Sequence, residues 1–261
     1  MNQSRFLWVA YVGLGAVMTV LILLNPGRFM SVDSHYYLRS ATNLLAGRGY
    51  VILEQGQWIW NGTFPIGYPA LIAILSGLTG LPILVASKVV NYAAIGMSGY
   101  GWVRRLGAAR AIWPLSIWGL GGFLKIAVYT WSETIFLVLL AEWVWGLYQF
   151  LQNPNATRTF SLFLLGYGLF LIRYVGGFVF GLTSLLALTS WLVPIWFQAK
   201  AEPSLSPTIS RKFLVIAVAG FAGMGMYFWM NQRLSGSLFG ESDLFQRNLP
   251  GSLSNFSVGR C

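Results

Sequence analysis

Long runs of apolar residues alternate with short polar segments along this chain. A helix of roughly 20 apolar residues crosses the hydrocarbon core of a bilayer, because the backbone groups in lipid must pair internally. Runs of about this length lie at Phe6–Leu24, Ile83–Val103, Ala111–Val128, Thr134–Phe150 and Phe213–Met230. The residues Phe160–Gly181 and Leu182–Phe197 predict a segment that rises, turns near "RYVGG" and descends. The fold class is therefore all-α, a polytopic membrane protein with about seven transmembrane helices.

The first polar loop, residues 25–82, has a helical pattern of its own. Apolar side chains recur at helical spacing from Asp33 to Leu45, which predicts a short amphipathic helix lying on the membrane surface. The apolar run Gly67–Thr79 is too short to cross and lies between prolines, so it predicts a juxtamembrane helix. We interpret residues 1–261 as a single membrane domain, with this loop and a polar tail at 231–261 on the outer side.

Charge patterning sets the expected orientation. Only 9% of the 261 residues are charged and 56% are hydrophobic, whereas soluble domains carry roughly a quarter charged residues. The net charge of +10 arises mostly from short loops between apolar runs, which indicates positive-inside topology and contact with membrane lipids, not nucleic acid. Three arginines in loop 104–110 place the N-terminus in the cytoplasm. The single cysteine, Cys261, excludes an internal disulfide.

On that topology, three ionisable residues fall at the outer face. Asp33 follows the first span, Glu133 begins the fourth in "TWSETIFLVLL", and Arg173 lies at the turn "IRYVGG". They are distant in sequence but level in depth, so they are candidates for one site on the periplasmic or lumenal side.

The stretches "VDSHYYLRSATNLLAGRGY", "FPIGYPALIAILSGLTG", "TWSETIFLVLL" and "IRYVGG" occur in this order. Together they resemble the C-type superfamily of membrane glycosyltransferases, relatives of the protein mannosyltransferases and aminoarabinose transferases. The similarity covers roughly residues 5 to 250 and corresponds to the amino-terminal half of such enzymes. The resemblance implies transfer of a sugar from a polyprenyl-phosphate donor to a lipid or polymer acceptor outside the cytoplasm.

The resemblance also assigns roles. The acid of the first outer loop, Asp33, would be the base that takes the proton of the acceptor hydroxyl. Arg173 suits the departing lipid phosphate, since a guanidinium offers a permanent charge and a planar fork of donors, and Lys88 would add to that phosphate site. Glu133 would position the acceptor. Inversion is expected from a single displacement, no cofactor is required, and a divalent cation remains an open alternative.

Each of these residues also has a structural interpretation. Asp33 and Glu133 are suited to cap the helices that they begin, the latter together with Ser132. Arg173 and Lys88 are long enough to reach the lipid headgroups from within a span.

Two further residues are auxiliary candidates. His35 is either a surface imidazole or part of a metal site with Asp33 and Glu133, so the metal is left undetermined. Glu142 lies about 13 Å deeper than Glu133 in the same span, where an acid is a functional candidate or a neutral hydrogen-bonded group of the bundle.

One departure from the family pattern concerns the first outer loop: Phe64 stands where some members carry a lysine before the prolines. Two rival functions follow from the residues. One is a non-catalytic scaffold or lipid-binding subunit that keeps the amino-terminal half of the fold. A second chain that completes the fold is a further possible partner. The other is a transporter, which would place its ionisable groups at mid-membrane. Of the candidate residues, only Glu142 is expected at that depth.

Overall fold

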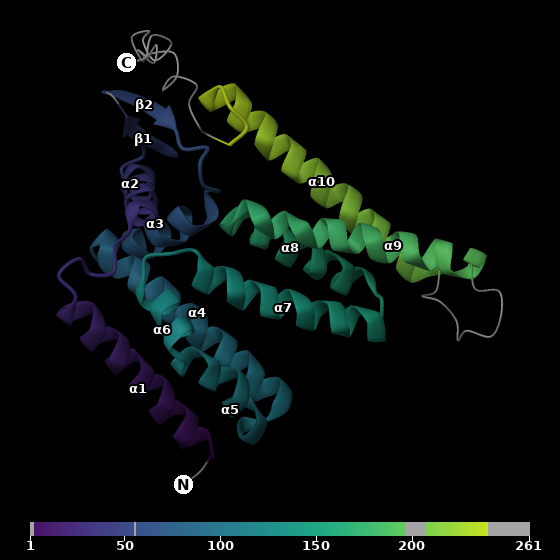
Figure 1. The fold of residues 1–261 in the computed structure, drawn as a ribbon, viewed down its shortest axis with the longest axis horizontal. Coiled ribbons are helices and arrows are strands. Elements are labelled where there is room, and N and C mark those ends of the chain that lie inside the picture. Colours follow the sequence, from purple (N-terminus) through teal and green to yellow (C-terminus); the bar gives the residue numbers. More distant parts are fainter. Residues whose placement is uncertain (1–2, 55, 197–206, 240–261) are drawn as a thin grey trace, which may run out of the picture.

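The computed structural model describes residues 3–54, 56–196 and 207–239, and most of this part is helical. Figure 1 shows an elongated bundle in which α1 borders one side, α7 and α8 run through the middle, and α9 and α10 extend along the other side. The all-α class is therefore confirmed.

The number of helices able to cross a membrane is smaller than the sequence predicts. Within the described residues, α1 (Gln3–Leu24), α7 (Glu133–Gln152) and α10 (Pro207–Ser235) are long and apolar enough. Two bent helix pairs raise the number to five if each pair counts as one span. The expected seven spans are thus not confirmed, whereas three to five are supported.

Both bends have identifiable causes. The helices α3 (Gly67–Thr79) and α4 (Ile83–Leu106) meet at 108°. Gly80 ends α3 in the left-handed region with φ 70°. Pro82, which precedes α4, cannot continue α3 because proline has no backbone N–H to donate. The predicted span Ala111–Val128 is not one continuous helix: it is divided into α5 (Ala108–Ser116), η1 (Ile117–Gly119) and α6 (Gly121–Val128), bent by 71° where Leu120 is extended.

The carboxy-terminal helices follow the predicted rise and descent. α8 (Ala156–Ile172) rises, the 3-10 turn η2 (Tyr174–Gly177) reverses the chain, and α9 (Phe178–Trp196) descends. α10 extends to Ser235, five residues beyond the predicted end of the last span, and Asn231 in this extension is buried. Most of the predicted tail 231–261, from residue 240 onward, lies outside the described residues.

The first polar loop holds both predicted helices and a hairpin that the sequence analysis missed. α2 (Val32–Leu45) and α3 match their predicted ranges to within one residue. Between them, β1 (Val51–Glu54) pairs antiparallel with β2 (Gln57–Trp60). The Trp60 Nε1 donates to Asn231 Oδ1 at 2.9 Å, so the hairpin is attached to the far end of α10.

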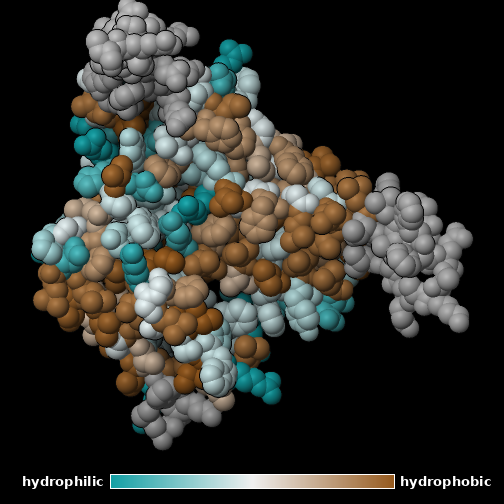
Figure 2. Space-filling model, in the orientation of Figure 1, coloured by the Kyte–Doolittle hydropathy of each residue, from teal (hydrophilic) through white to brown (hydrophobic). Residues whose placement is uncertain are grey.

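Buried side chains form two clusters. One lies where α2, α3 and α4 meet α6 and α7, around Tyr37, Tyr68 and Ile72, and the other joins α7, α8, α9 and α10 around Trp143 and Phe180. Figure 2 shows apolar side chains gathered on the outside of α1 and over the α8–α10 region. Apolar residues on both the inside and the outside are expected of helices that face lipid, so the membrane assignment is supported.

Candidate functional site

The connection between α6 and α7, residues 129–133, lies at the centre of the polar contacts in this molecule. The Thr130 N–H donates to Phe29 O at 3.2 Å, and the Thr130 carbonyl accepts from Ser34 Oγ at 3.0 Å. Its hydroxyl lies 2.9 Å from that of Ser87. One buried residue therefore joins the loop after α1, the first turn of α2, and α4.

The next two residues fasten the start of α2 further. Trp131 Nε1 donates to Ser31 Oγ at 2.7 Å, and the hydroxyl of Ser132 lies 3.1 Å from that of Tyr37. Arg173 Nη1 donates to the same Ser132 oxygen at 3.4 Å. The residues 130–132 thus bring the first turns of α2 to the place where α7 begins and η2 turns.

Glu133 and Arg173, which are 40 residues apart in sequence, form an ion pair with Nη1 2.5 Å from Oε1. Both side chains are about one-third exposed, so solvent partly screens the pair. The second carboxylate oxygen, Oε2, is buried and makes no hydrogen bond to the residues that the structure describes. A buried carboxylate oxygen left unpaired is costly, so Oε2 is an acceptor that this part of the chain does not satisfy.

Asp33 lies in the first turn of α2 with its side chain exposed. The interpretation of Asp33 as the N-cap is wrong: Ser31 occupies that position and forms a reciprocal capping box with Ser34. The Asp33 carboxylate has no ion pair or side-chain hydrogen bond among the residues that the structure describes. It is therefore available for chemistry, while the helix dipole favours its charge.

The charges of Asp33, Glu133 and Arg173 all act on the pKa of the Tyr37 hydroxyl. Burial raises the pKa of Tyr37 to about 12, while the hydrogen bond with Ser132 and the charge of Arg173 act to lower it. The carboxylates of Glu133 and Asp33 act in the other direction. All three predicted outer residues thus act on the same buried hydroxyl.

Lys88 adjoins this site through two main-chain carbonyls. Its side chain is 8% exposed, and its ammonium donates to Val128 O at 2.7 Å and to Phe29 O at 3.2 Å. Phe29 and its neighbour Arg28 both adopt positive φ, near 50°, which is uncommon for residues other than glycine. Lys88 also lines a cavity of about 530 Å³ between α1 and α4 that includes Arg28.

His35 points away from the three charges. Its Nδ1 lies 2.8 Å from the carbonyl of Ser31, which accepts, and the ring lines a separate hollow of about 330 Å³ with Arg39. No group of three His, Cys, Asp or Glu residues in the described part of the chain is arranged to hold a metal ion. The site predicted from Asp33, His35 and Glu133 is therefore not assembled.

Glu142 belongs to a separate cluster near the other end of α4. It accepts two donors of Arg105, one at 2.9 Å, and the Arg105 Cζ lies 5.4 Å from the ring centres of Trp102 and Trp145. Glu142 was expected to be hydrogen-bonded within the bundle, and the structure pairs it with the guanidinium of Arg105 on α4, a partner that the sequence analysis did not anticipate. It is an anchor between α4 and α7.

Phe64, which stands where some members of the family carry a lysine, packs against an aromatic side chain of α2. Its ring centre lies 4.7 Å from that of Tyr37, and the Tyr50 hydroxyl donates to its carbonyl at 3.0 Å. Sequence reasoning missed Ser132 and Tyr37, which connect the predicted charges. The only signal for Ser132 is its place beside Glu133 in "TWSET".

No family model, curated protein or solved structure matches this chain.

Proposed function

We propose that this protein is an inverting membrane glycosyltransferase that moves a sugar from a polyprenyl-phosphate donor to a lipid or polymer acceptor on the non-cytoplasmic side. The observation that carries the proposal is the Glu133–Arg173 pair beside the exposed carboxylate of Asp33, with Tyr37 and Ser132 between them. A base, a phosphate-binding cation and an unpaired carboxylate oxygen are the groups that this reaction needs.

In the proposed reaction, the acceptor oxygen forms a bond to the anomeric carbon while the bond from that carbon to the phosphate oxygen breaks. Asp33 takes the hydroxyl proton, and the polyprenyl phosphate departs with the bonding electron pair. Single displacement on the face opposite the leaving group inverts the configuration.

Arg173 and Glu133 have complementary parts in this proposal. Arg173 uses one nitrogen for Glu133 and Ser132, and a guanidinium has five N–H donors, so further donors can meet the phosphate as its charge grows. Glu133 fixes the guanidinium through Oε1, while Oε2 accepts from a hydroxyl of the acceptor or the sugar.

Lys88 supports the site from an adjoining position. An ammonium has three N–H donors and two are used by carbonyls, so one remains for the donor phosphate. His35 and Glu142 have no part in the proposed step. The proposal keeps about seven membrane spans for this chain, and completion of the fold by a second chain is part of the same proposal.

The test is transfer in membranes from a panel of radiolabelled polyprenyl-phosphate sugars, with wild type beside Asp33→Asn. Loss of a general base typically costs a factor of about 10² to 10⁴ in rate. Arg39→Gln, an exposed change on the same helix, is the matched control and should retain activity.

A non-catalytic scaffold is the second candidate, and the bonds of Lys88 to two carbonyls favour it, because they use a predicted phosphate ligand for structure. It predicts that no donor supports transfer and that Asp33→Asn leaves the protein's role in the cell unchanged.

A further inference from the structure

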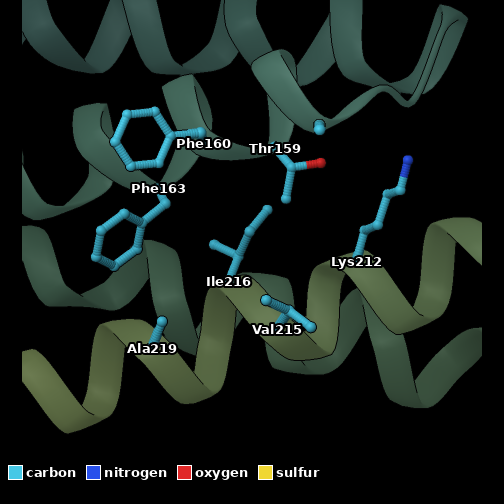
Figure 3. Close-up of a pocket in the computed structure, with 8 residues that line it drawn as sticks. Thr159, Phe160, Phe163, Lys212, Val215, Ile216 and Ala219 are labelled. Atoms are coloured by element: carbon cyan, nitrogen blue, oxygen red, sulfur yellow. The ribbon is translucent and has the colours of Figure 1, made fainter.

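A groove between α8 and α10 lies at the opposite end of α8 from Arg173. It encloses about 420 Å³ and is lined mostly by apolar side chains, with Thr159 and Lys212 as its polar members. Figure 3 shows Phe160 and Phe163 on α8 facing Ile216 and Ala219 on α10, with Lys212 rising from α10 at the far end. Because both helices carry exposed apolar residues, the groove opens toward lipid.

Positive charge gathers at the Lys212 end of this groove. The Lys212 ammonium donates to the carbonyl of Pro154, in the loop between α7 and α8, and the side chain is only partly buried. Arg158, in the first turn of α8, donates to Gln149 O and Asn153 O. Arg211, the residue before Lys212 in α10, is exposed. Three cationic residues therefore lie where α7 ends and where α8 and α10 begin (Figure 1).

The acidic side chains that the structure describes do not neutralise this end. Glu133 begins α7 and Gln152 ends it, and these 20 residues span roughly 30 Å. Asp33 lies near Glu133, and Glu142 is paired with Arg105. None of the acidic side chains that the structure describes is therefore paired with Lys212, Arg211 or Arg158.

We propose that this groove binds an anionic phospholipid, with one acyl chain against Phe163, Ile216 and Ala219 and the phosphate at Lys212. Basic pockets between transmembrane helices are suited to lipid phosphates, and the apolar wall suits the chain. The site is separate from the proposed donor site, since the 17 residues of α8 place Arg173 roughly 25 Å away.

The test is native mass spectrometry of the purified full chain in detergent, titrated with phosphatidylglycerol or with phosphatidylcholine of the same acyl chains. A cation near a lipid phosphate contributes enough for a roughly five-fold difference in affinity. We expect wild type to bind phosphatidylglycerol at least five-fold more tightly, and Lys212→Gln to lose most of that preference. Glutamine still offers an N–H to Pro154, so the fold is retained.

Two variants separate charge from shape. Arg104→Gln removes an exposed cation from the end of α4, away from the groove, and should leave the preference unchanged. Ala219→Phe fills the groove and should weaken the binding of both lipids. Equal binding of the two lipids by wild type, equal effects of Lys212→Gln and Arg104→Gln, or unchanged binding by Ala219→Phe would each overturn the proposal.

Discussion

Gly67 is the point of closest approach between α3 and the end of α8, and its replacement by alanine tests how the site is held. A Cβ at this position would lie 2.5 Å from Leu171 O and 2.8 Å from the carbonyl carbon of Leu171. Carbon atoms pack best at about 3.5–4.0 Å, so α3 and α8 must separate by about 1 Å. The obstacle is backbone, which cannot rotate away as a side chain can.

The magnitude follows from two opposed effects. Overpacking of this kind costs about 1–3 kcal/mol, while alanine gains at most about 1 kcal/mol over glycine in a helix. Gly67 is the first residue of α3, where that gain is smaller. We expect a net loss of about 1–2 kcal/mol in the free energy of unfolding. Because Leu171 lies two residues before Arg173, the Arg173–Glu133 pair should also be displaced and transfer should fall.

The assay is reversible unfolding in mixed micelles, with transfer activity measured on the same preparations. Gly225→Ala in α10 is the matched control, because no atom lies within 4 Å of its added Cβ, and it should be neutral or stabilising by up to about 1 kcal/mol. If Gly67→Ala proved as stable as Gly225→Ala, the close contact of α3 with α8 and the reasoning built on it would be refuted.

Three further predictions concern the polar contacts. Glu142→Gln should destabilise the fold by about 1–3 kcal/mol, since it leaves a partly buried Arg105 without its carboxylate; a double-mutant cycle with Arg105→Gln should show coupling in micelle unfolding, and additive losses would contradict it. Lys88→Met should cost about 1–3 kcal/mol in the same assay, because the buried bond to Val128 O is lost and Phe29 O keeps only its bond from the Thr130 N–H; an unchanged stability would show that neither bond of Lys88 matters. Tyr37 holds its proton more tightly when folded, with a pKa of about 12 against 10.0, so its stabilising effect is complete below pH 10 and is lost as the pH rises through 12. Wild type should therefore lose more stability than Tyr37→Phe between pH 10 and 12, and equal losses would remove Tyr37 from the explanation.

The helices were largely predictable because their signals are local. α3 coincides with its predicted range, and α2 differs by one residue, since both depend on apolar spacing and on glycines and prolines at their ends. The hairpin was missed because its strands have only four residues each, inside a segment read as polar loop. Its turn depends on Gly56, at φ 81°. A single glycine in a polar loop does not by itself predict a hairpin turn.

The charged residues of the candidate site could be predicted from the sequence, but the hydrogen bonds that join them could not. Asp33, Glu133 and Arg173 stood out because charge is rare in this chain, and their shared depth followed from the expected spans. The hydroxyls of Ser132 and Tyr37 that join them are common groups in common positions. Likewise, nothing in the sequence around Glu142 indicates that Arg105, 37 residues earlier, lies against it. Such pairings are decided by how the helices pack.

The bonds that fix residues 127–131 have a consequence for mutational tolerance. Most of the acceptors are main-chain carbonyls: Val128 accepts from Lys88, Thr130 accepts from Ser34, and Asn91 donates to Tyr129 at 3.0 Å. Every residue type carries such a carbonyl, so the identity of the accepting residue is almost irrelevant. In a saturation scan, the side chains at 128 and 129 should vary freely within the limits of size, while the three donors should admit few replacements. For these carbonyls, the sequence information that positions the segment therefore lies in the donors on α2 and α4, and within the segment only the side chains of Thr130 and Trp131 add to it.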